Sequence, residues 1–156
     1  MIATTLKPQD SHASYIRCED DPWLTLDPES GAQIKLCRLT PSSGEIVCLI
    51  RVPAGETLAK HYHAGTVAVY TVQGRWSYGE GWDAGPGDVI YEPAGSTHAP
   101  TMTGTGPTTI FAIIQGGFEF VDDEGAIIAR CTWKDLNDIY LAHCSTQGIK
   151  PRDLTA

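Results

Sequence analysis

The sequence predicts a single all-β domain, a small β-barrel or jelly roll, followed by one C-terminal helix. From Gln33 onward, strand-like segments and turns alternate about every 8–12 residues, a spacing typical of sandwiches and barrels. Short clusters drawn from 16 glycines and 10 prolines supply the turns. A chain of 156 residues is long enough to bury a core as one domain.

The elements follow in order from hydrophobic periodicity and from the turns between them. Alternating or continuous apolar segments with β-branched residues predict strands at 23–26, 34–39, 45–52, 66–73, 75–82, 89–92, 108–115, 118–121 and 126–130. We expect segment 75–82 to be the hairpin partner of segment 66–73, because only Gly74 separates them.

One helix is expected near the C-terminus, where Trp133, Leu136 and Tyr140 recur at helical spacing. Thr132 is a suitable N-cap, and Asp135, three residues later, predicts a capping box. The predicted division is an N-terminal arm over 1–30, the barrel with its helix over 31–145, and a tail over 146–156.

Composition excludes several classes of function. Eleven basic against nineteen acidic residues give a net charge of −8, which argues against nucleic acid and anionic membrane as partners. The N-terminus lacks an apolar signal region, and no apolar segment reaches the roughly 18 residues of a membrane span. Five cysteines without a C-x-x-C motif are typical of reduced thiols. We therefore expect a cytoplasmic protein.

Three histidines carry the strongest chemical signal. His61 and His63 are two residues apart, so on a strand both side chains project from the same face and can bind one cation. His98 follows another turn and can complete the set from a neighbouring strand. Imidazole nitrogen suits Fe, Zn, Ni and Cu, so the pattern predicts a metal site with open coordination positions.

The residues around these histidines resemble the two motifs of the cupin superfamily. Gly55, His61, His63 and Gly74 match the first motif, and Gly87, Pro93, Gly95 and His98 match the second. The chain departs from the family at Val67, where a glutamate ligand is usual, and at Met102, where an asparagine is usual. The resemblance implies a double-stranded β-helix barrel with the metal inside, here bound by three neutral imidazoles.

A closer resemblance concerns segments 74–82 and 86–98, which are similar to the 2,4'-dihydroxyacetophenone dioxygenases. Segment 117–129 is similar to the acetylacetone-cleaving dioxygenases. Both resemblances imply non-haem Fe(II) and O2, with cleavage of a carbon–carbon bond beside the carbonyl of an α-hydroxyketone or β-diketone. They also imply a homodimer or homotetramer.

Glu80 is a candidate for the carboxylate that is missing at Val67, either as a metal ligand or as a catalytic base. It could instead be an exposed residue at the tip of a hairpin, and Glu92 is an alternative carboxylate. Alternation from His63 predicts that Val67 and Val69 face inward. Together with three aromatic residues they are the candidate substrate pocket: Val67, Val69, Trp76, Tyr78 and Phe111.

Two other functions remain open from the sequence. One is a non-catalytic zinc sensor, because small cupins also resemble the zinc-binding domain of anti-sigma factors. The other is an oxygen-independent cupin reaction on Zn or Mn, such as isomerisation or hydrolysis. Stoichiometric zinc without oxygen chemistry would favour the first, and turnover without O2 the second.

Overall fold

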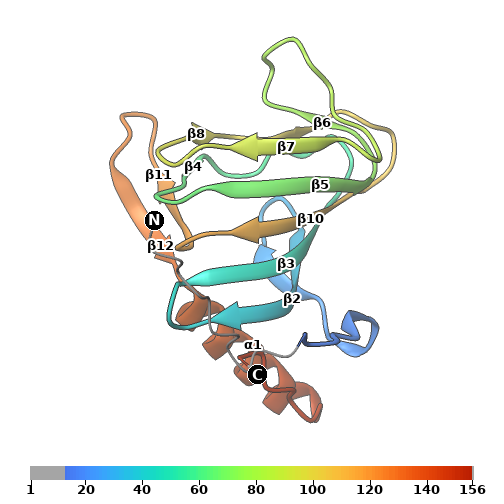
Figure 1. Ribbon diagram of the computed structural model, residues 1–156. Helices are drawn as coiled ribbons and strands as arrows, with labels where there is room; N and C mark the ends of the chain where they lie inside the picture. Colours follow the sequence, from blue (N-terminus) through green and yellow to red (C-terminus); the bar gives the residue numbers. More distant parts are fainter. Residues whose placement is uncertain (1–12, 156) are drawn as a thin grey trace, which may run out of the picture.

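Two antiparallel sheets face each other in the computed structural model, which describes residues 13–155 (Figure 1). The larger sheet has six strands in the order β1 (Leu24–Asp27), β2 (Ala32–Thr40), β3 (Glu45–Val52), β10 (Thr108–Ile114), β5 (Val67–Gln73) and β7 (Val89–Glu92). The smaller has four in the order β12 (Ile127–Cys131), β11 (Phe118–Val121), β4 (His61–Tyr62) and β8 (Thr97–His98). β6 (Trp76–Ser77) pairs separately with β9 (Thr101–Met102). The expected all-β jelly roll is confirmed.

The core fills the space between the sheets because each strand alternates inward and outward side chains. In β3, Ile46, Cys48 and Ile50 are buried, whereas the residues between them are partly exposed. Trp76 is the largest fully buried side chain, and its indole Nε1 donates a hydrogen bond to Thr71 Oγ1 at 2.8 Å. This bond satisfies the polar atom that burying a tryptophan would otherwise leave unpaired.

A helix, α1 (Trp133–Gln147), lies beneath the end of the larger sheet that β1 and β2 form (Figure 1). The Thr132 hydroxyl accepts a hydrogen bond from the amide of Asp135, whose carboxylate accepts one from the Thr132 amide, so the predicted capping box is confirmed. Gly148, which has a φ of 66°, caps the C-terminal end of the helix. Leu136, Tyr140 and Cys144 form its buried face.

The residues after α1 pack back against the barrel. The Arg152 guanidinium binds the carboxylate of Asp21 at 2.7 Å and also donates to the Cys37 carbonyl. Leu154 is 1% exposed, and its carbonyl accepts a hydrogen bond from the Leu39 amide. These contacts join the first described residues and the C-terminal segment to β2. Within the described range no helix is long and apolar enough to cross a membrane.

Most of the expected strands are confirmed, but the one expected over 75–82 is wrong. Only Trp76 and Ser77 are extended there, and they pair with β9 instead of continuing a hairpin with β5. Gly79 and Gly81 have φ values of 81° and 83°, which end the strand and form a projecting loop. The expected helix is present and extends three residues beyond 144, to Gln147.

We predict that Gly74→Ala destabilises the protein more than Gly55→Ala. Both glycines have positive φ, 84° and 78°, so either alanine costs about 1 kcal/mol of backbone strain. A Cβ on Gly74 would also lie 2.5 Å from Thr108 Oγ1 and 2.6 Å from Thr108 Cα, whereas one on Gly55 would meet nothing within 4 Å. The clash adds about 1–3 kcal/mol, measurable by urea unfolding. Equal losses in the two variants would contradict this prediction.

Candidate metal centre

His61, His63 and His98 come together at the inner face of the smaller sheet. β4 and β8 are antiparallel neighbours in which His61 lies directly opposite His98, and His63 follows β4 by one residue. The possible ligand atoms of the three residues all lie within 4.8 Å of one another. The three ring centroids are 4.8–5.2 Å apart. Such a cluster could hold one metal ion.

The protonation of these rings favours metal binding. Burial lowers the pKa of His61 to about 4, although the bond to Ala59 opposes the shift. Burial likewise lowers the pKa of His63. Both rings are therefore neutral at pH 7 and offer a nitrogen lone pair. His61 Nδ1 lies 2.8 Å from the carbonyl oxygen of Ala59, an acceptor that places the ring proton on Nδ1 and leaves Nε2 free for a metal.

Glu92 supplies a carboxylate to the same place. It is 5% exposed, and its Oε2 lies 3.4 Å from His63 Nε2 and 3.3 Å from His98 Nε2. Donor atoms bound at about 2.1 Å around one ion are separated by roughly 3.0–3.4 Å, so these spacings place the carboxylate close to a cation held by the histidines. Glu92 also lies directly opposite Val67 in the pairing of β5 with β7. It therefore brings a carboxylate next to the position where the resemblance to cupins leads us to expect a glutamate.

Several polar atoms in this cluster have no hydrogen-bond partner. They are buried, and they include His63 Nδ1, His98 Nε2, Glu92 Oε2 and Ser96 Oγ. A buried polar group without a partner costs about 1–3 kcal/mol, and more when it is charged. A bound cation would satisfy the unpaired nitrogen of His98 and would lie beside the negative charge of Glu92. The donor set therefore fits a divalent metal.

Tyr78 holds Glu92 in position. Its hydroxyl donates a short hydrogen bond to Glu92 Oε1, and its ring stacks on His98 with centroids 4.5 Å apart and planes inclined by 15°. Burial and the adjacent Glu92 charge raise the pKa of Tyr78, so the hydroxyl keeps its proton. Burial raises the pKa of Glu92, but the adjacent imidazole of His98 and the hydrogen bond from Tyr78 outweigh it, so the net pKa is lowered. Glu92 is therefore a carboxylate at neutral pH.

An apolar cavity of about 70 Å³ adjoins the cluster inside the barrel. Of the predicted pocket residues, Val67, Val69, Trp76 and Tyr78 line this cavity. Phe111 does not, because its neighbours Ile110 and Ala112 face inward and alternation places Phe111 on the outer surface. Phe118, which sequence reasoning missed, lies beside the histidines, with its ring centroid 6.1 Å from that of His61. The lining is apolar apart from Asp27, His61, His63, Tyr78, Glu92 and Thr108.

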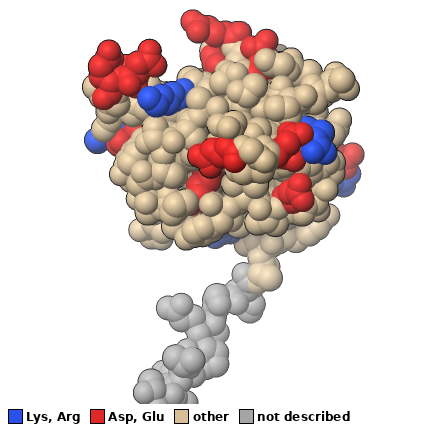
Figure 2. Space-filling model, turned by 90° about the horizontal axis from the view of Figure 1, so that it is seen from above, with Lys and Arg blue, Asp and Glu red and all other residues tan. Residues whose placement is uncertain are grey.

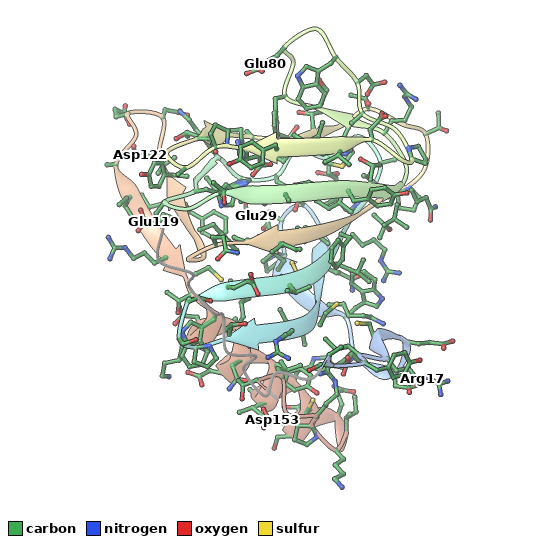
Figure 3. All side chains as sticks on the ribbon, in the orientation of Figure 1. Arg17, Glu29, Glu80, Glu119, Asp122 and Asp153 are labelled. Atoms are coloured by element: carbon green, nitrogen blue, oxygen red, sulfur yellow. The ribbon has the colours of Figure 1, made fainter. Side chains whose placement is uncertain are left out.

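The structure places Glu80 apart from the three histidines. Its side chain is exposed in the loop that projects above β6 and β7 (Figure 3), because Gly79 and Gly81 interrupt the alternation on which the prediction relied. The cluster of possible metal ligands among the described residues consists of the three histidines and includes neither Glu80 nor Glu92. Glu80 lines an outer hollow, which Tyr78, Glu92 and His98 also line. The pairing of Val67 with Glu92 was the signal that could have identified the carboxylate, but it required the register of β5 with β7.

Comparison with known proteins identifies this metal-binding barrel as a cupin. The model of the ChrR cupin-like domain matches residues 11–118, and the chain belongs to that family. An RmlC-like cupin protein from Ralstonia eutropha JMP134 has a TM-score of 0.87 and 37% identity, over 93% of this chain and 95% of that one. This similarity agrees with the two-sheet fold described above.

The chain is also similar to proteins that cleave acetylacetone. It is 24% identical over 137 residues to the acetylacetone-cleaving enzyme of Acinetobacter johnsonii, covering 82% of this chain and 88% of that enzyme. The structure of an acetylacetone dioxygenase from Acinetobacter johnsonii has a TM-score of 0.75 and 20% identity, over 90% of this chain and 99% of that one. The chain is therefore a cupin that resembles these enzymes.

We predict that each of His61→Ala, His63→Ala and His98→Ala abolishes stoichiometric metal binding. Loss of a residue that only orients a ligand costs about 10–100-fold in affinity, so loss of a ligand should cost about 100-fold or more. Elemental analysis after dialysis against Fe(II) or Zn(II) measures the bound metal. His143→Ala is the matched control, because His143 lies on α1 outside the cluster. Full metal content in any of the three variants would remove that histidine from the site.

We also predict that the metal-free protein loses stability as the pH falls from about 6.5 toward 4. An unfolded histidine takes up a proton below about pH 6.5, whereas folded His61 does so only near pH 4. The unfolded state therefore binds more protons in this window, and the free energy of unfolding decreases. Urea unfolding at several pH values in a chelator gives the slope. His61→Gln should flatten it, and an unchanged slope would contradict the assignment.

Proposed function

We propose that the protein is a non-haem Fe(II) dioxygenase that cleaves a carbon–carbon bond next to a carbonyl, with a short β-diketone as the preferred substrate class and an α-hydroxyketone as the other. The observation that carries the proposal is the cluster of three histidines next to one buried carboxylate, with His61, His63 and Glu92 lining a small apolar cavity. The similarity to acetylacetone-cleaving enzymes supports the same chemistry.

Fe(II) held by His61, His63 and His98 would supply a Lewis acid that binds two substrate oxygens and would bring O2 beside them. A β-diketone has a carbon between its carbonyls whose proton must leave before oxygen attacks. Glu92 Oε2 faces the histidines without a hydrogen-bond partner, so it is free to accept that proton. The overall reaction consumes one O2 for each bond cleaved; a β-diketone yields an acid and a dicarbonyl compound, and an α-hydroxyketone yields two acids.

The remaining residues of the site position the substrate and exclude water. Tyr78 donates to Glu92 Oε1, which fixes the carboxylate and keeps Oε2 directed at the metal position. Val67, Val69 and Phe118 give the cavity apolar walls against which short alkyl groups can pack. Because these walls are apolar, they exclude water from the cavity. Without water, the electrostatic interaction between the Glu92 carboxylate and the acidic proton of the substrate is stronger.

The experiment that tests this function is oxygen uptake by Fe(II)-loaded protein against a panel of short β-diketones and aromatic α-hydroxyketones. We expect one O2 per substrate cleaved, with the β-diketones faster because the cavity is small and apolar. Glu92→Gln should lower kcat by about 10²–10⁴ if Glu92 is the base. Iron content measured in parallel separates loss of the base from loss of the metal.

Glu80→Gln is the matched control, because it makes the same chemical change in the exposed loop. Its kcat should equal that of the unmodified protein. A large loss in Glu80→Gln with full activity in Glu92→Gln would reverse the two assignments. Iron-loaded protein that takes up no oxygen with any compound would exclude the dioxygenase.

A second candidate is the zinc sensor, which the matched ChrR cupin-like family favours. It requires tight stoichiometric zinc at the same histidines and no oxygen chemistry. The cavity beside the metal position and the unpaired Glu92 Oε2 argue against it, since a structural zinc site has all its positions filled by protein. An oxygen-independent isomerase or hydrolase remains a third candidate, and turnover under argon would identify it.

A further inference from the structure

Two of the five cysteines lie together outside the metal centre. Cys18 begins a short turn of 3₁₀ helix, Cys18–Asp20, and Cys37 lies on β2. Both are free thiols; Cys18 is partly exposed, whereas Cys37 is 3% exposed. The reaction proposed above uses neither of them.

A β-bulge directs Cys37 toward the segment that contains Cys18. The pairing of β2 with β3 shifts by one residue between Leu36 and Arg38, so Cys37 has no partner residue on β3. Leu36 packs in the core, and alternation turns Cys37 to the opposite side, which is that of Lys35. Lys35 Nζ in turn donates a hydrogen bond to the Cys18 carbonyl at 2.9 Å. The face of β2 that carries Cys37 is therefore the face that contacts Cys18.

A second set of contacts holds the same two residues. The Arg152 guanidinium donates to the Cys37 carbonyl at 2.9 Å and binds the Asp21 carboxylate at 2.7 Å. The Asp21 amide donates to the Cys18 carbonyl at 3.3 Å. Backbone contacts therefore hold the two cysteines near each other, through Lys35 and also through Asp21 with Arg152.

The two thiols also interact with each other. Burial above all, and then a hydrogen bond with the Cys18 thiol, raise the pKa of Cys37 to about 12. Cys37 is therefore a protonated thiol at pH 7, which reacts slowly with oxidants by itself because the thiolate is the nucleophile. Cys18 is the accessible member of the pair, and the cationic side chains of Lys35 and Arg152 lie close to it. Partial exposure beside positive charge is typical of reactive cysteines.

We propose that Cys18 and Cys37 form an oxidation site, at which hydrogen peroxide converts the two thiols into a disulfide. The Cys18 sulfur attacks the peroxide first and takes one oxygen atom to become a sulfenic acid, while the other oxygen leaves as water. The Cys37 sulfur then displaces the hydroxyl of the sulfenic acid, which leaves with the Cys37 proton as a second water. In total the two thiols lose two electrons and one peroxide is reduced to water.

Charge indicates which oxidant suits this site. The chain carries a net charge of −8, and acidic residues occupy several parts of its surface (Figure 2). Glu19 and Asp20 directly follow Cys18. Hydrogen peroxide is uncharged and approaches such a surface without electrostatic cost, whereas an anionic disulfide such as oxidised glutathione is repelled.

The disulfide would fasten the segment before β1 to β2. It closes a loop of about 20 residues, which lowers the entropy of the unfolded chain. The loop includes Trp23, whose ring centroid is 4.4 Å from the Arg51 guanidinium, and β1, whose Leu26 and Asp27 line the cavity. Oxidation would therefore restrain one part of the cavity wall and leave the metal ligands unchanged. In a reducing compartment thiol exchange would reopen the bond, so the link would last only as long as the oxidant.

The test treats the whole chain, in a chelator, with stoichiometric hydrogen peroxide and counts free thiols after unfolding. We expect the count to fall from five to three, and dithiothreitol to restore it. Peptide mapping by mass spectrometry without reductant should join the peptides of Cys18 and Cys37. Closure of the loop should raise the Tm by about 6–12 °C.

Two matched variants identify the reacting pair. Cys37→Ala and Cys131→Ala each remove one buried cysteine, but Cys131 lies on β12 of the smaller sheet. Cys131→Ala should still form the disulfide. Cys37→Ala should not, and its Cys18 should instead be labelled by dimedone, which traps sulfenic acids. Circular dichroism checks the folding of both variants.

Cys18→Ser replaces the partly exposed member of the pair, so the test does not depend on the folding of a core variant. Peroxide should leave its thiol count and its Tm unchanged. Retention of all five thiols by the unmodified protein would overturn the proposal. A disulfide that joins any other pair, or that still forms in Cys18→Ser, would overturn it equally.

Discussion

The register between neighbouring strands is the constraint on which this site depends. Pairing of β4 with β8 puts His61 opposite His98, and pairing of β5 with β7 puts Glu92 opposite Val67. His61, His98 and Glu92 lie on three different strands, so the ladder hydrogen bonds bring them together, and Tyr78 then fixes the Glu92 carboxylate. A one-residue slip in either pair would turn a ligand to the outer surface.

Burial and charge then act together on that arrangement. Removing His61 and His63 from water keeps their imidazoles neutral, which is the form that binds metal. The same burial would disfavour a carboxylate, but the adjacent His98 and the hydrogen bond from Tyr78 compensate and hold the pKa of Glu92 low. The result is a set of imidazoles with one negative charge beside it and an apolar cavity in front. Uncharged substrates that become anionic on losing a proton suit such surroundings.

Much of the fold could be predicted from the sequence, because alternating apolar residues and glycine-containing turns depend only on residues that are close in the chain. Histidines two residues apart on a strand identified the metal position for the same reason. The carboxylate could not be assigned this way, since Glu92 reaches the cluster through pairing with a strand about twenty residues earlier. Glu80 seemed to share a face with Trp76 and Tyr78 only because alternation was assumed to continue through Gly79 and Gly81.

Strands β5 and β7 serve both surfaces of the larger sheet at once. On β5 the odd-numbered Val67 and Val69 face the cavity, while Ala68 and Tyr70 face outward; on β7 Glu92 faces inward and Tyr91 outward. A substitution can therefore change the cavity lining without changing the outer surface of the sheet, so the two surfaces can evolve independently. An insertion or deletion cannot do this. One added residue in either strand would exchange its inward and outward side chains, which would disrupt the cavity lining and the outer surface together.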